Sequence, residues 1–146
     1  LSARHRVPAA LARHPRIQRI PARGWSVYRA AMRGRRLHLA LYPLMDTPFN
    51  RARSPNKLIE HGVVGAAPLY SRCWPEARRA AASGAGLLLG NRATEWRAAI
   101  DDLVANSGRM RALASGAGAL ARKLNQPGPQ RRLWAELMEV SLDAAA

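Results

Sequence analysis

Short apolar runs that alternate with segments of helical periodicity are the feature that most constrains this chain. The runs are residues 37–44, 66–71 and 84–90, and residues 16–21 form a weaker candidate strand. Glycine or proline lies beside each run. Between the runs and after the last one, apolar residues recur three or four positions apart, which predicts helices at residues 24–36, 54–64, 74–83, 95–107, 109–125 and 130–142. Thr94 is the expected cap of the fourth of these helices, and Pro129 is expected to open the last. This alternation predicts right-handed crossovers and a parallel sheet. We therefore expect an α/β fold: a Rossmann-like, doubly wound parallel sheet, partial, of about four strands, with helices on both faces and a helical carboxyl-terminal end.

The length and composition restrict the class of protein. A chain of 146 residues suits one domain with its own core. No run approaches the ~18 apolar residues of a membrane span. The single Cys73 excludes an internal disulfide and offers no zinc-ligand spacing. We expect a cytoplasmic protein, with peripheral attachment to the inner face of a membrane as an alternative.

The net charge of +15 is concentrated at the start of the chain. Residues 1–45 hold ten arginines and no acidic residue. Either attraction to phosphates or an anionic membrane, or simply GC-rich coding, accounts for the excess of arginine. The aromatic residues are too scattered for a single-strand stacking platform, and no zinc finger or RNP motif is present. Nucleic acid is therefore the less favoured partner.

The sequence SPNKLIE at residues 54–60 has the chemistry of a helix start that binds an anion. Ser54 suits the N-cap position and Pro55 the first helical position. Lys57 would then lie in the first turn, where it is mildly unfavourable unless an anion such as phosphate occupies the free N–H groups. Glu60 shares a face with Lys57 and could accept hydrogen bonds from the hydroxyls of a ribose.

Less specific interpretations of these residues remain open. Lys57 and Glu60 could form an ordinary solvated pair on the helix surface. Arg51 and Arg53 could be plain loop charges, and His61 is more often structural than catalytic in such a position.

The run LALYPLMDTPFNRARSPNKLIEHGVVGAAPLYS, continued by GAGLLLGNRATEWRAAIDDLVANSGRMRALA, resembles the carboxyl-terminal domain of group 1 glycosyltransferases of the GT-B fold. The resemblance implies that residues 16–146 are part of a nucleotide-sugar-binding domain, after a linker or ragged start at residues 1–15. It implies a two-domain enzyme that transfers a sugar from a nucleotide-diphosphate donor. The acceptor, a carbohydrate or a lipid-linked molecule, would be held mainly by a missing amino-terminal domain, so the isolated chain is expected to be inactive.

The resemblance also implies roles for individual residues. Lys57 matches the basic residue that contacts the donor diphosphate, and Glu60 matches the glutamate that holds the ribose. These two are the expected catalytic residues. The expected substrate-binding residues are Asn50, Arg51, Arg53, Ser54, Pro55, Asn56, Lys57 and Glu60. Ala52 stands where the family motif has its first glutamate. We expect no cofactor and no metal, because no Asp-x-Asp pair suited to Mg²⁺ is present.

Two other functions fit the composition. One is a non-catalytic basic remnant that binds an anionic membrane or a partner protein. The other is a nucleic-acid-binding module, for which affinity should fall steeply with salt.

Overall fold

The computed structural model describes residues 13–18, 23–128 and 132. The chain divides into two units, residues 1–32 and 33–146, and each is described by itself. Helix α2 (Trp25–Arg33) begins in the first unit. The ring of Trp25 stacks on the ring of Tyr28, with centroids 5.9 Å apart. Residues 16–18 form no strand, and residues 19–21 of the expected first strand lie outside the described part of the chain.

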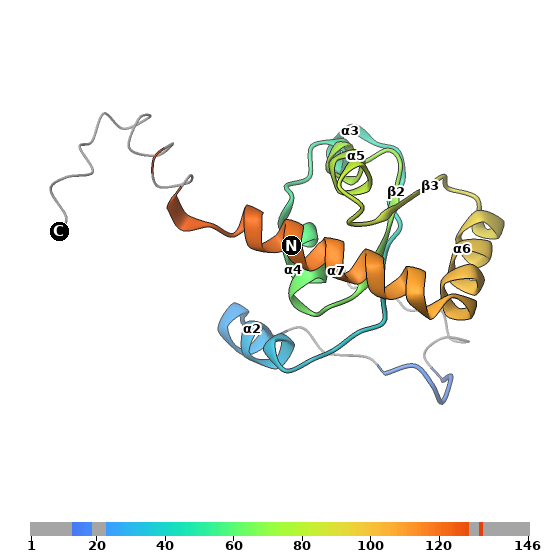
Figure 1. Ribbon diagram of the computed structural model, residues 1–146, viewed down its shortest axis with the longest axis horizontal. Coiled ribbons are helices and arrows are strands. Elements are labelled where there is room, and N and C mark those ends of the chain that lie inside the picture. Colours follow the sequence, from blue (N-terminus) through green and yellow to red (C-terminus); the bar gives the residue numbers. More distant parts are fainter. Residues whose placement is uncertain (1–12, 19–22, 129–131, 133–146) are drawn as a thin grey trace, which may run out of the picture. The chain divides into compact units, whose positions relative to one another are not determined.

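A parallel sheet forms the centre of the second unit (Figure 1). Its strands are β1 (Leu39–Tyr42), β2 (Ala67–Ser71) and β3 (Leu87–Leu89), in the order β1-β2-β3. The α/β class and the parallel pairing are confirmed. The described residues form three strands where about four were expected, because residues 16–18 do not contribute one.

Five helices of the second unit follow the strands. Their bounds are α3 (Pro48–Arg51), α4 (Asn56–Val63), α5 (Pro75–Ala82), α6 (Ala93–Ala105) and α7 (Ser107–Leu124). The periodicity predicted all of them except α3, a single turn in the loop after β1. Among the described residues, no helix is both long and apolar enough to cross a membrane. The helix expected from Pro129 onward lies almost wholly outside the described residues.

Side chains alternate between the two faces of the sheet and build a separate cluster on each. One cluster joins the sheet to α4, α5 and α7, and the other joins it to α6 and α7. Helices on both faces are therefore confirmed. The buried members of the first cluster are Leu58, Tyr70, Trp74, Ala77, Ala80, Ala85, Ala117 and Leu120, and those of the second are Ala67, Leu69, Leu89, Leu103 and Leu113.

Helix α7 joins the two clusters by passing the segments that lead into β2 and β3. A Cβ on Gly116 would lie 2.4 Å from the carbonyl oxygen of Gly84, just before β3. A Cβ on Gly62, at the end of α4, would lie 2.4 Å from the carbonyl oxygen of Ala117. Only glycine allows backbones to approach this closely. The amino-terminal ends of the strands are thus closed by close packing, whereas the opposite ends carry the loops.

Two predicted helix caps are wrong. Helix α4 begins at Asn56, with Pro55 at the N-cap position and no side-chain capping hydrogen bond, so Ser54 is not the cap. Helix α6 begins at Ala93, which places Thr94, the expected cap, inside its first turn. The N-cap position of α4 lies one residue after Ser54, and that of α6 lies two residues before Thr94.

Candidate ligand-binding site

The loops after all three strands meet at the carboxyl ends of the sheet. Ligands of open parallel sheets bind at this end. The buried Ser71, the last residue of β2, ties the loops together: its hydroxyl accepts a hydrogen bond from the Leu44 amide at 2.7 Å and donates to Asn91 Oδ1 at 3.3 Å. The three loops are therefore fixed to one another before any ligand binds.

A pocket of about 400 Å³ lies between the loop after β1 and the first turn of α4. We call it the α4 pocket. Its size is within the usual range for small-molecule sites. It brings together five of the eight residues expected to bind substrate. The lining residues are Tyr42, Phe49, Ala52, Arg53, Ser54, Asn56, Lys57 and Glu60.

Lys57 and Glu60 form an ion pair on the wall of the α4 pocket. Because α4 begins at Asn56, Lys57 occupies the second helical position rather than the expected third. Their side chains are 35% and 22% exposed, so the pair is more buried than a solvated surface pair. Both groups keep further hydrogen-bonding capacity, since an ammonium has three donors and a carboxylate about four acceptor sites.

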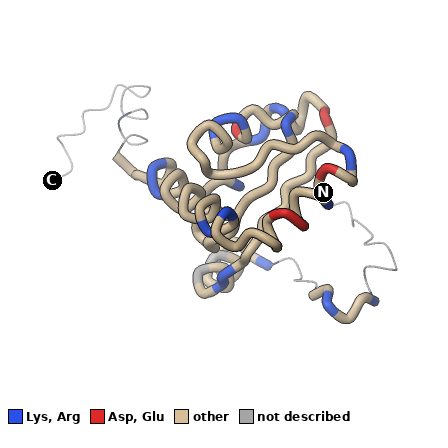
Figure 2. The backbone as a smooth tube through the Cα atoms, turned by 45° about the vertical axis from the view of Figure 1, so that its right-hand side comes forward, with Lys and Arg blue, Asp and Glu red and all other residues tan. Residues whose placement is uncertain are grey.

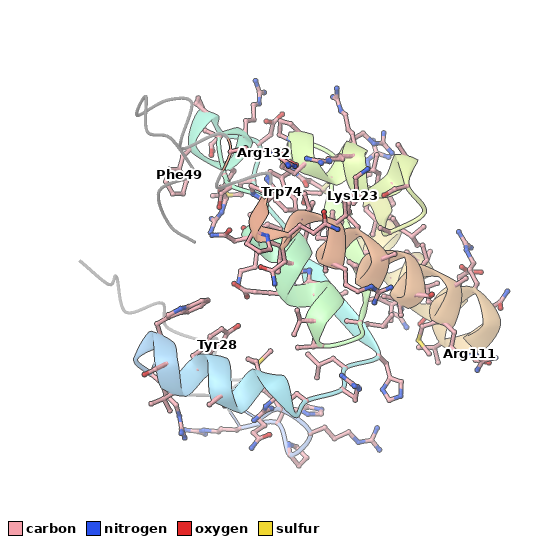
Figure 3. The ribbon with its side chains drawn as sticks, turned by 60° about the vertical axis from the view of Figure 1, so that its left-hand side comes forward. Tyr28, Phe49, Trp74, Arg111, Lys123 and Arg132 are labelled. Carbon is pink, nitrogen blue, oxygen red and sulfur yellow. The ribbon has the colours of Figure 1, made fainter. Side chains whose placement is uncertain are left out.

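Arg53 adds a second cation to the α4 pocket and is held in place by aromatic residues. Its guanidinium carbon lies 5.5 Å from the ring centroids of both Tyr42 and Phe49, which are cation–π distances. Its backbone carbonyl accepts a 2.9 Å hydrogen bond from the indole of Trp74, a fully buried residue. Figure 3 labels Phe49 and Trp74 in this region.

Sequence reasoning missed the aromatic part of the site. Tyr42 and Phe49 line the α4 pocket, but no spacing in the sequence links them to each other or to Lys57. The available signal was Phe49 itself, a large apolar residue within a polar loop, which is 75% exposed in the structure.

Three expected substrate-binding residues do not line the α4 pocket. Asn50 stabilises the loop, because its amide nitrogen donates to the carbonyl of Met45 at 2.8 Å. Arg51 pairs with Asp46 at 2.6 Å, and this hydrogen bond holds the pKa of the Asp46 carboxyl below its ordinary value. Pro55 begins the turn into α4. These residues shape the loop whose other members form the pocket wall.

His61 lies behind Glu60 and packs against the sheet. Its Nδ1 is 3.2 Å from the Tyr70 hydroxyl, and the two rings stack with centroids 5.6 Å apart. Burial, with the nearby Lys57 charge as a smaller cause, lowers the pKa of His61 to about 4. The imidazole is therefore neutral at pH 7, which suits a structural role.

The charged residues that the structure describes in the second unit are spread over several elements. Figure 2 shows Lys and Arg on the strand-end loops and on several helices rather than gathered on one element. Among the described residues, no group of three or more His, Cys, Asp and Glu could hold a metal ion.

Comparisons of the chain with known protein families, with curated proteins and with solved structures found no match. Any assignment of function therefore depends on the residues and the geometry described above.

Proposed function

We propose that this chain is the donor-binding part of a glycosyltransferase and binds a nucleotide-diphosphate sugar in the α4 pocket. The sheet would be the carboxyl-terminal half of a Rossmann-like, doubly wound GT-B domain. The observation that carries the proposal is the position of Lys57 and Glu60 on one pocket wall, in the opening turns of a helix, at the carboxyl end of a parallel sheet.

The diphosphate would bind at the first turn of α4. Backbone N–H groups at a helix start favour anions, and Lys57 adds a full positive charge beside them. Arg53 can contribute a second cation from the loop side of the pocket. As the bond from the sugar to the β-phosphate breaks, negative charge grows on the phosphate, and these fixed positive groups stabilise it. Donors that are already in position need no reorganisation during the reaction.

Glu60 would bind the ribose, one turn deeper than the phosphates. A carboxylate there can accept hydrogen bonds from both vicinal hydroxyls, as the acidic residue of dinucleotide-binding folds does. The Lys57–Glu60 ion pair keeps both side chains directed along the same wall. The acceptor, a carbohydrate or lipid-linked molecule, would bind mainly to a second domain, and the isolated chain would not turn over.

Calorimetric titration with UDP and GDP at fixed salt tests the proposal. Lys57→Ala should weaken binding by about 1.5–3 kcal/mol, the value of a hydrogen bond to a charged group. Glu60→Gln should weaken UDP more than 2′,3′-dideoxy-UDP, which lacks the hydroxyls. Arg111→Ala is the matched control, because Arg111 lies on α7, outside the pocket (Figure 3). Unchanged affinity in both pocket variants would refute the assignment.

The net charge of +15 favours a second candidate, a basic module that binds nucleic acid or an anionic membrane. For this function, affinity for arbitrary RNA or for anionic vesicles should fall steeply with salt and should not respond to UDP or GDP. The spread of Lys and Arg over many elements of the second unit supports it less than a single basic stripe would.

A further inference from the structure

A second, larger hollow lies on the other side of the loop after β1. Its volume is about 620 Å³, and its walls come from the end of β1 and from α6. We call it the apolar groove. Apart from Asn91 and Arg97, the lining is apolar. The lining residues are Leu41, Pro43, Leu44, Met45, Asn91, Ala93, Trp96, Arg97 and Ile100.

The apolar groove exposes side chains that ordinarily avoid water. Leu41 is 49% exposed and Met45 is 74% exposed. The groove has a defined wall on the α6 side, where the indole of Trp96 donates to the carbonyl of Gly90 at 2.7 Å. Larger apolar surfaces of this kind mark binding sites.

A pocket that contains arginines adjoins the apolar groove at Asn91. This arginine pocket has a volume of about 310 Å³ and is lined by Asp46, Arg72, Cys73, Arg78, Leu89, Gly90 and Asn91. Asn91 lines both hollows, and Met45 and Asp46 are consecutive residues in the two walls. The two hollows are therefore parts of one surface at the carboxyl ends of the strands.

The charge of the arginine pocket is suited to an anion. The Asp46 carboxylate is paired with Arg51, and the guanidinium nitrogen of Arg72 lies 3.7 Å from the Glu95 carboxylate oxygen. The Arg78 side chain has no hydrogen bond or ion pair with any of the described residues. The Asn91 amide oxygen accepts from Ser71, which leaves its NH₂ group able to donate.

We propose that these joined hollows bind an anionic amphiphile, with its single apolar chain in the apolar groove and its phosphate-type head at Arg78 and Arg72. The apolar groove, with the arginine pocket at one end, fits a lipid phosphate better than a sugar, because a sugar would need polar groups along the whole groove. If the proposed glycosyltransferase function holds, on which this role rests, the amphiphile is the part of a lipid-linked acceptor that contacts this chain, while the second domain binds the rest. The donor occupies the α4 pocket, which the loop after β1 also lines.

Three ligands separate the contributions of the head and the chain. Dodecyl phosphate, below its micelle concentration, should bind with one molecule per chain. Inorganic phosphate and a neutral dodecyl ether should each bind about tenfold more weakly or not at all, because each satisfies only one of the two hollows. Cys73 is the only cysteine of the chain and lines the arginine pocket, so bound dodecyl phosphate should also slow its alkylation.

Variants with matched controls test the location. Arg78→Ala should weaken dodecyl phosphate binding by about tenfold, the effect of losing a charge-assisted contact. Met45→Gln should weaken it by about threefold or more through lost apolar contact, and the fold should tolerate this change because Met45 is exposed. Arg111→Ala and Val104→Gln change an exposed arginine and an exposed apolar residue outside both hollows, and should have no effect.

Several results would overturn the inference. Equal affinity for inorganic phosphate would reduce the site to a head-group contact. Equal affinity for the neutral ether would indicate an apolar surface for some other occupant, such as a protein element. Equal losses of affinity in the two control variants would indicate that dodecyl phosphate adsorbs to the protein surface without a defined site. The proposed function is judged separately by UDP and GDP binding, which Arg78→Ala should leave intact just as Lys57→Ala should leave amphiphile binding intact.

Discussion

The indole Nε1 of Trp74 donates a hydrogen bond to the backbone carbonyl of Arg53 across 2.9 Å. Trp74 is fully buried at the start of α5, and its ring also packs edge-on against Tyr42, with centroids 5.1 Å apart. A core residue thus fixes the segment that leads into α4. The position of the α4 pocket depends on the interior of the protein as well as on its own loop.

Trp74→Phe should reduce the affinity for UDP or GDP as well as the stability. The change keeps an aromatic ring but removes the donor and leaves a cavity beside the smaller ring, at a cost of at least about 1 kcal/mol in the free energy of unfolding. The freed loop should also hold Arg53 less firmly. Trp96→Phe removes a similar bond, from Trp96 to the carbonyl of Gly90, outside the α4 pocket. Urea denaturation should show a loss of stability for both variants, and a larger one for the fully buried Trp74, whereas calorimetry should show weaker nucleotide binding only for Trp74→Phe. Equal nucleotide affinity in the two variants would contradict this role of Trp74.

Gly116→Ala should destabilise the protein, and Gly118→Ala should not. At Gly116 the new methyl group would meet the backbone of Gly84 at 2.4 Å, which forces α7 away from the sheet and costs about 1–3 kcal/mol. At Gly118 the nearest atom is the flexible end of Arg122 at 3.5 Å, so alanine should stabilise the helix by about 0.4–1 kcal/mol. Urea midpoints measure both changes. Similar midpoints would mean that α7 does not pack against Gly84 this closely.

Stability should decline as the pH falls from about 6.5 toward about 4. The unfolded His61 binds a proton near its ordinary pKa of 6.5, whereas burial lowers the folded pKa to about 4. Protons therefore favour the unfolded state in this window, and the contribution is fully present only above it. Between about pH 7.5 and pH 5 the loss should be about 2 kcal/mol. His61→Gln should show a flatter profile over the same range, and parallel profiles for the two proteins would exclude His61 as the cause.

Ser54→Ala should change the stability by only a few tenths of a kcal/mol, the usual effect of a surface substitution. Helix α4 has Pro55 at its N-cap and receives no side-chain cap. Asn106→Ala is the informative comparison, because Asn106 Oδ1 accepts from the Arg109 amide at 3.0 Å and caps α7. Its loss should cost about 1 kcal/mol. Thermal unfolding of the two variants would decide whether a cap exists at Ser54 after all.

The regular elements of the second unit were predictable from local patterns. The runs that contain β1, β2 and β3 are apolar and are bounded by glycine or proline, and α4 to α7 have clear periodicity. The proximity of Lys57 and Glu60 followed from their spacing alone. Helix α3 was missed because one turn is too short to show a period.

The surroundings of the Lys57–Glu60 ion pair could not be predicted, because they depend on contacts between distant segments. Tyr42, Trp74 and Phe49 come from three different elements or loops, and only the folded sheet brings them to Arg53. The prediction of a cap at Ser54 was also wrong: α4 has Pro55 at its N-cap position, and the residue before Ser54 is held through its carbonyl by the distant Trp74, a contact that the local pattern does not show. The joined apolar groove and arginine pocket likewise have no counterpart in the linear sequence.

The close packing of α7 against the amino-terminal side of the sheet separates two kinds of change in this protein. Substitutions on that side alter how firmly the domain holds together, whereas substitutions in the loops on the other side alter what it can recognise. New specificities could therefore arise in the loops by ordinary mutation without endangering folding, which makes this small sheet a suitable scaffold for directed evolution of its ligand preference.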